Sequence, residues 1–187
     1  MNYELLIAID EALFIFLNSH HNDFWDVLMS LITHRFTSIP LYIFLIYLII
    51  KEFRKQSFVI LPFITLLIFA SDRISSGLIK PYFQRLRPCY ESKLQQTIHV
   101  VNGCGGEYGF VSSHAANSFA ISIFLFLLFR DNKYMKWLLA WAALVSYSRI
   151  YMGVHYPGDI MCGGLLGLIL AWVFYYAFTK FKVQFAI

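Results

Sequence analysis

The sequence has 187 residues, of which 59% are hydrophobic and 14% are charged, with a formal net charge of +4. A soluble domain has about a quarter of its residues charged, so this composition argues against a water-soluble protein and indicates a single membrane domain. The basic residues are dispersed and form no arginine-rich arm, which excludes nucleic acid as a partner.

The first apolar stretch, residues 4 to 17, is interrupted by Asp10 and Glu11 and is too short to cross a bilayer. We expect an interfacial or half-inserted helix there, followed by a second short helix at 23 to 33. Residues 1-34 would thus form interfacial N-terminal helices. The absence of a basic n-region and of a small-residue cleavage site predicts that this segment is retained.

Five apolar runs follow, each near the roughly 20 residues that a helix needs to cross hydrocarbon. They cover residues 36 to 51, 57 to 78, 113 to 130, 134 to 152 and 157 to 180. They predict an all-α fold, a polytopic membrane helix bundle of about five to six transmembrane helices with one long extracytoplasmic loop. The bundle would occupy 36-182 of a single domain, 1-187.

Lysine and arginine favour cytoplasmic loops, and here they cluster after the first, third and fifth runs. The clusters are Lys51, Arg54 and Lys55, then Arg130, Lys133 and Lys136, then Lys180 and Lys182. All three fall on one side, so the loop 79 to 112 and the turn 150 to 157 share the outer face. We expect an integral protein of a bacterial inner (plasma) membrane with its active site on the extracytoplasmic face.

The outer loop is nevertheless basic, with Lys80, Arg85, Arg87 and Lys93 where the charge rule predicts few cations. In the segment KPYFQRLRP, the planar guanidinium of Arg87 can hold two phosphate oxygens and Lys80 adds a compact charge, whereas Arg85 points at a different angle. These residues predict an anion site. The alternative is simple contact with anionic lipid headgroups.

The segment GFVSSHAANSFA opens the third run with Ser112, Ser113 and His114. Small residues at a helix start leave backbone amides free, and such amides bind phosphate. The pKa of an ordinary histidine lies near neutral pH, so His114 is suited to protonate a departing oxygen. Its alternative role is that of a helix cap or a surface residue.

The segment SRIYMGVHYPGD joins the fourth and fifth runs. His155 and Asp159 are four residues apart and share a helix face, so Asp159 can hold one ring nitrogen while the other attacks. Arg149 lies where an unpaired guanidinium is costly. The alternative is that Arg149 and Asp159 pair only to tie two helices together.

The three segments together supply cations, amides, a nucleophile and an acid, which phosphoryl transfer requires. The acidic residues are scattered and no zinc or paired-carboxylate motif occurs, so we expect a metal-independent site with no cofactor.

From Lys80 to Asp159 the sequence resembles the type 2 phosphatidic acid phosphatases, the membrane branch of the acid phosphatase and vanadium haloperoxidase superfamily. The first motif, K-x(6)-R-P, matches at Lys80, Arg87 and Pro88, and the third, S-R-x(5)-H-x(3)-D, matches at Ser148, Arg149, His155 and Asp159. The middle motif, usually P-S-G-H, appears as Val111, Ser112, Ser113 and His114, so its proline and glycine are replaced.

The resemblance implies a lipid phosphatase in which His155 forms a phosphohistidine, Asp159 orients it and His114 acts as acid and then base. Lys80, Arg87 and Arg149, with Ser112 and the amide of Ser113, would bind the phosphate. The preferred substrate is undecaprenyl diphosphate, and the alternatives are phosphatidic acid, phosphatidylglycerol phosphate and lipid A phosphates. A non-catalytic lipid-binding or transport protein is the alternative class.

Cys89 and Cys104 fall in the same outer loop. In an oxidising space they would form a disulfide next to the phosphate site; the alternative is two free thiols.

Overall fold

The computed structural model describes residues 2–34 and 36–184, and this part of the chain is helical with no strand. The α-helices are α1 (Tyr3–Asn18), α2 (Asp23–Thr33), α3 (Ile39–Phe53), α4 (Ser57–Asp72), α5 (Lys80–Phe83), α6 (Ser113–Leu128), α7 (Trp137–Tyr151) and α8 (Pro157–Gln184). A π-helical stretch, Arg73–Ile79, joins α4 to α5 without a break. The elements agree with the predicted runs to within a few residues at most ends.

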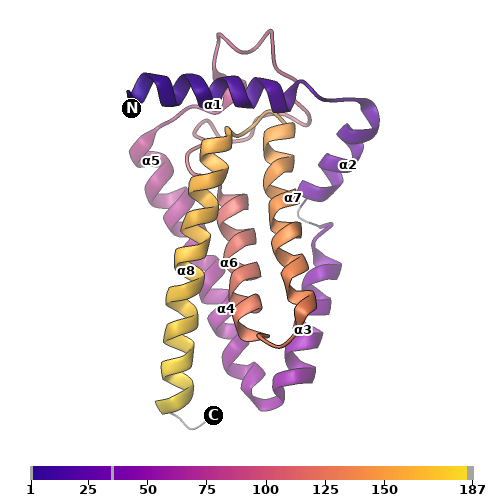
Figure 1. Cartoon of the computed structure of the whole chain (residues 1–187), viewed down its shortest axis with the longest axis vertical. Coiled ribbons are helices and arrows are strands. Elements are labelled where there is room, and N and C mark those ends of the chain that lie inside the picture. The colour runs from indigo at the N-terminus through magenta and orange to yellow at the C-terminus, as the bar shows by residue number, and fades with distance from the viewer. Residues whose placement is uncertain (1, 35, 185–187) are drawn as a thin grey trace.

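Helix α6 lies at the centre of the bundle and packs against α4, α7 and α8 (Figure 1). Its contact with α8 is close because α8 carries glycines on the facing side: a Cβ at Gly163 would lie 2.5 Å from the carbonyl oxygen of Ser112. Phe124 and Leu125 of α6 are completely buried in the main apolar cluster. The central helix α6 is therefore well covered by its neighbours.

The outer surface of the bundle is apolar. Large side chains such as Phe58, Leu66, Trp172 and Val173 are more than half exposed. Two helical stretches, Ile39–Phe83 and Pro157–Lys182, are long and apolar enough to cross a membrane. Exposed apolar side chains on long helices are the surface that lipid tails cover, and the chain is a membrane protein.

Helix α1 lies across one end of the bundle instead of along it, and α2 descends from it beside α7 (Figure 1). Phe14 of α1 is completely buried, while Leu5, Ile9 and Phe16 are about half exposed or more. The acidic pair that interrupts the apolar stretch thus belongs to a helix lying flat on the bundle end.

Polar contacts fix these N-terminal helices to the rest of the fold. The side-chain amide of Asn18 donates to the carbonyl oxygens of His99 and Tyr151 at 2.9 and 2.8 Å. On α2, the Asp26 carboxylate accepts from the Tyr151 hydroxyl at 2.6 Å and lies 2.9 Å from Nε2 of His99. These hydrogen bonds therefore fix α1 and α2 to the long loop before α6 and to the end of α7.

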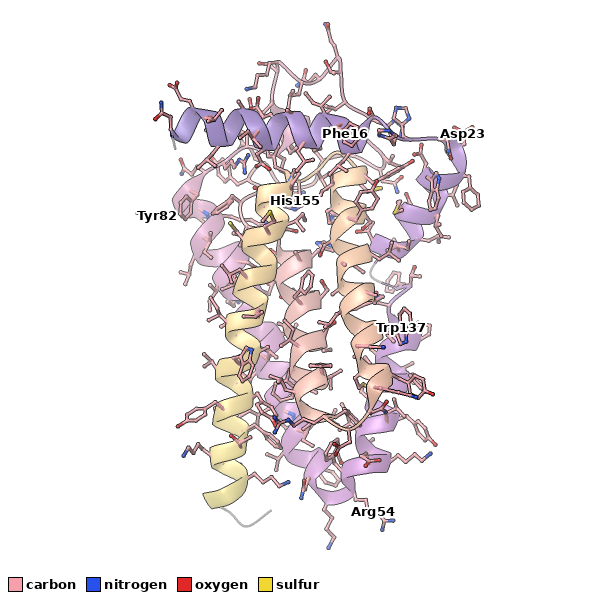
Figure 2. The ribbon with its side chains drawn as sticks, viewed as in Figure 1. Phe16, Asp23, Arg54, Tyr82, Trp137 and His155 are labelled. Carbon is pink, nitrogen blue, oxygen red and sulfur yellow. A yellow bond between two sulfur atoms is a disulfide. The ribbon has the colours of Figure 1, made fainter. Side chains whose placement is uncertain are left out.

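The two ends of the bundle differ in chemistry. Arg54, in the turn between α3 and α4, lies at the end where α8 finishes, whereas His155 lies at the other end, below α1 (Figure 2). The turn between α6 and α7 lies at the Arg54 end too, as the charge clusters predict. The long loop 84–112 covers the His155 end.

Candidate active site

Three chain segments meet at the end of the bundle that α1 covers. The start of α5 provides Lys80, the start of α6 provides His114, and the junction of α7 and α8 provides Arg149, His155 and Asp159. Each side chain stands at or next to a helix end, where backbone groups have no partner within the helix. The fold therefore gathers the three sequence motifs in one place.

The geometry at the start of α8 follows from its local sequence. Pro157 takes the first helical position, which suits its fixed φ, and Asp159 lies two residues later. The Asp159 carboxylate accepts the backbone N–H of Tyr156 at 3.1 Å and lies 3.2 Å from Nδ1 of His155. One aspartate thus caps the helix and orients the imidazole, which leaves Nε2 of His155 for chemistry.

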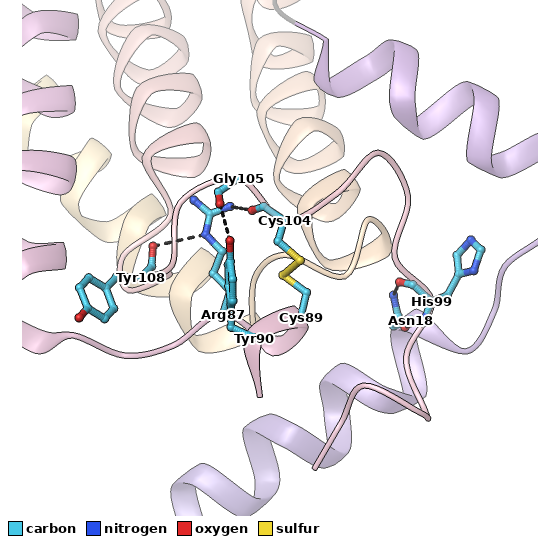
Figure 3. Close-up of a disulfide and its surroundings, with 8 residues drawn as sticks. All are labelled: Asn18, Arg87, Cys89, Tyr90, His99, Cys104, Gly105 and Tyr108. Carbon is cyan, nitrogen blue, oxygen red and sulfur yellow. Dashed lines mark hydrogen bonds between the residues drawn. A yellow bond between two sulfur atoms is a disulfide. The ribbon is translucent and has the colours of Figure 1, made fainter. Parts of the chain in front are cut away.

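Arg87 is held by the loop that follows α5. Its Nη1 donates to the carbonyl oxygen of Cys104 at 2.7 Å and its Nε donates to that of Tyr108 at 3.3 Å (Figure 3). A disulfide joins Cys104 to Cys89, which lies two residues after Arg87. The crosslink therefore anchors both the guanidinium and the carbonyl that positions it.

Lys80 and Arg149 are cations without a carboxylate partner among the residues the structure describes. Arg149 donates from Nη1 to the Thr33 hydroxyl at 2.7 Å, but its buried Nε has no partner in that part of the chain. A buried, unsatisfied guanidinium N–H is costly unless a ligand completes it. The sequence left open that Arg149 and Asp159 form an ion pair that ties two helices together. The structure shows no such ion pair.

The serines of the middle motif differ in what they offer. Ser112 is completely buried, and its hydroxyl caps α6 by accepting the N–H of Ala115 at 3.5 Å. The Ser113 hydroxyl bonds to Ser75 and Ser76 of the π-helical stretch at 3.0 and 2.8 Å. Both hydroxyls are therefore used in the fold, and the backbone amide of Ser113 stands at the start of α6, where amides have no partner within the helix.

The electrostatics of the site favour an anion. Burial, and then the positive charges of Arg87, Lys80 and Arg149, hold the pKa of His155 well below its usual range. His114 is in electrostatic contact with the same cations and with His155. The imidazole of His155 is consequently neutral at neutral pH, which is the form that can attack phosphorus.

Sequence reasoning missed two partly buried ion pairs of the site, both made by Arg85. Arg85 donates from Nη1 to Asp159 at 2.9 Å and from Nη2 to Asp10 of α1 at 2.7 Å. Asp10 also accepts the backbone N–H of Gly158 at 2.7 Å. The signal that could have found them is Asp10 itself, a carboxylate interrupting an apolar helix.

A family model described as the PAP2 superfamily matches residues 59–182, about two thirds of the chain. The chain belongs to the PAP2 superfamily. The sequence is 38% identical over 184 residues to the lipid A 4'-phosphatase of Bacteroides thetaiotaomicron, covering 97% of this chain and 82% of that one. It is 27% identical over 175 residues to the undecaprenyl-diphosphatase BcrC of Bacillus subtilis, covering 94% and 83%.

Among solved structures, the fold is similar to that of LpxE from Aquifex aeolicus, with a TM-score of 0.69 and 24% identity over 87% of this chain and 92% of that one. The PAP2 assignment and these relatives confirm the predicted resemblance. This PAP2 protein is a phosphoric monoester hydrolase of the lipid phosphate phosphatase class. The preference for undecaprenyl diphosphate is supported only by the more distant relative, and the comparisons favour the alternative of a lipid A phosphatase.

Proposed function

We propose that the protein hydrolyses a phosphate monoester of lipid A, or of a closely related phosphorylated sugar lipid, and releases inorganic phosphate. The similarity to a lipid A 4'-phosphatase over nearly the whole chain supports this substrate. The observation that carries the chemistry is the convergence of Lys80, Arg87 and Arg149 on His155, with the buried Nε of Arg149 lacking a partner among the described residues. An anion with several oxygens is the ligand that such a set of donors requires.

In the proposed reaction, Nε2 of His155 attacks phosphorus, and a nitrogen–phosphorus bond forms as the ester phosphorus–oxygen bond breaks. His114 gives its proton to the departing oxygen, which leaves as a hydroxyl. His114 then takes a proton from water, which attacks the phosphohistidine, releases phosphate and restores His155. Asp159 holds the Nδ1 side of His155 throughout.

Phosphate binding in this proposal belongs to side chains and amides instead of a metal ion. Lys80, Arg87 and Arg149 neutralise the oxygens, with the amide of Ser113 and the helix cap at Ser112 shaping the cradle. A loss of activity in EDTA would contradict this part of the proposal.

We propose that α3, α4, α6, α7 and α8 span a bacterial inner membrane as one domain, with His155 on the extracytoplasmic side and α1 in the interface. The basic residues at the Arg54 end support this orientation, because cations stay on the cytoplasmic side. The disulfide in the loop at the His155 end supports it too, since such bonds persist in oxidising compartments.

The test is phosphate release by the detergent-solubilised protein from lipid A, undecaprenyl diphosphate and phosphatidic acid, each with EDTA present. We expect lipid A to give the highest kcat/KM and mass spectrometry to show loss of a single phosphate. A preference for undecaprenyl diphosphate would refute the substrate assignment. Release from none of the three lipids would refute the proposed function.

Two histidine variants test the assigned roles. His155→Ala and His114→Ala should each lose turnover by at least about a thousandfold, because one removes the nucleophile and the other the acid. His114→Ala should accumulate phosphohistidine after brief exposure to a substrate with a good leaving group. His20→Gln, at an exposed histidine outside the site, is the matched control.

A further inference from the structure

A cavity of about 230 Å³ adjoins His114. Side chains from α2, α3, α4, α6 and α7 line it, and Ser113 and His114 form the wall that it shares with the active site. Lys80, Arg87, Arg149 and His155 are absent from its described lining. The cavity therefore lies beside the acid that serves the leaving group, not beside the nucleophile.

Two polar groups of the cavity are hydrogen-bond acceptors without a partner among the described residues. Oδ1 of Asn117 is buried and has no partner in the described part of the chain. The carboxylate of Asp72 forms no hydrogen bond or ion pair with any described residue either. The unpaired oxygen of Asn117 is costly because it is buried, unless a ligand supplies an O–H or N–H group, whereas the exposed Asp72 carboxylate adds a second acceptor at the cavity.

The remaining lining suits a compact ring. Thr33, whose hydroxyl accepts from Arg149 at 2.7 Å, connects the cavity to the phosphate site, and the aromatic rings of Tyr42 and Trp141 stand on its wall. Aromatic rings beside a few polar groups are typical of sites for small polar molecules.

We propose that this cavity is the leaving-group subsite, which binds an uncharged, hydroxyl-bearing sugar whose donors reach Asn117 and Asp72. The proposal rests on the proposed function and specifies its selectivity. When the ester bond breaks and His114 protonates the departing oxygen, the sugar hydroxyl that forms stays in this cavity.

The same cavity discriminates against diphosphate substrates. Cleavage of undecaprenyl diphosphate would leave a second phosphate, an anion, next to His114. The carboxylate of Asp72 would repel that charge and cannot donate a hydrogen bond to it. Selectivity for a sugar phosphate thus arises from the leaving-group side of the site.

The experiment compares kcat/KM for lipid A with that for p-nitrophenyl phosphate, whose leaving group has no donor to offer Asn117. Asn117→Leu should lower kcat/KM for lipid A by about tenfold to a hundredfold and change that for p-nitrophenyl phosphate by less than about twofold. Activity on the small substrate also reports that the variant is folded. Thr65→Val, at an exposed side chain of α4, is the control.

Asp72→Asn provides the second arm, because this exposed side chain can be changed without disturbing the core. It should raise the ratio of kcat/KM for undecaprenyl diphosphate to that for lipid A by about tenfold. Equal losses on all substrates, or an unchanged ratio in both variants, would overturn the subsite while leaving the phosphatase assignment intact. A wild type that releases phosphate from no lipid would overturn both.

Discussion

The contact between Arg85 and Asp10 links the covering helix α1 to the chemistry of the site. Arg85 binds Asp159 with one guanidinium nitrogen and Asp10 with the other. Asp159 in turn orients His155. Asp10→Asn removes the charge that holds Arg85 in place, and Arg85→Gln removes the cation between the two carboxylates. Both variants should loosen Asp159 and thereby lower kcat, with little change in KM.

The size of the effect follows from the burial of the pair. The two side chains are 26% and 15% exposed, so their interaction lies between that of a screened surface pair and that of a buried one. Its coupling free energy should be about 1.5 kcal/mol after this screening is taken into account, which corresponds to about tenfold in rate. Each single variant should therefore lose about tenfold or more in kcat.

A double-mutant cycle measures the coupling through kcat on lipid A or p-nitrophenyl phosphate. Since both substitutions break the same link, the double variant should be within about threefold of the worse single variant. Multiplicative losses would refute the reasoning, as would a fully active Asp10→Asn. Glu4→Gln, at an exposed carboxylate of the same helix, is the control.

Three further outcomes are expected. The acid limb of the pH profile of kcat/KM should lie well below pH 6.5, because the pKa of His155 is depressed and the neutral imidazole persists as the pH falls. Arg87→Gln should move that limb to higher pH. An unmoved limb would refute the assignment of His155 as the nucleophile. Replacing Cys89 and Cys104 by serine should lower the free energy of unfolding by about 3 kcal/mol for a loop of this length, measured as a lower Tm. The same change should raise KM, because Arg87 is no longer held in place. An unchanged Tm and KM would contradict the anchoring role of the disulfide. Desolvation raises the pKa of Asp26, but the hydrogen bonds from Tyr151 and His99 outweigh it, and the pKa is lowered. Asp26→Asn should therefore reduce the free energy of unfolding above about pH 4 and abolish the further loss of stability at lower pH. The kcat should not change.

Most of the fold could be predicted because long apolar helices are recognisable in a sequence by their length and hydropathy. The predicted run 157 to 180 coincides with the start of α8, where Pro157 and Asp159 give a strong local signal. The first run was placed three residues too early, since Pro40 sets the start of α3 at Ile39. Hydropathy marks the apolar stretch, but the cap residues determine where the helix begins.

The site was predictable where its residues follow a spacing along the chain. His155 and Asp159 are four apart, and this spacing does bring them into contact. Arg85 was expected to lie at a different angle from Arg87; it follows the end of α5 at Phe83, and its guanidinium binds Asp159. Asp10, Asp72 and Asn117 reach the site only through packing between distant helices, which a single sequence does not display.

The hydrogen bond from Gly158 to Asp10 joins residues 148 positions apart. Asp10 emerges early from the ribosome, and its partner emerges only as the last helix is made. Until the start of α8 has been made, His155 lacks its partner Asp159, and Asp10 of α1 lacks its partner Gly158. On the proposed mechanism, a chain that stops before α8 lacks Asp159, and we expect it to be unable to hydrolyse the lipids of the membrane that it is entering.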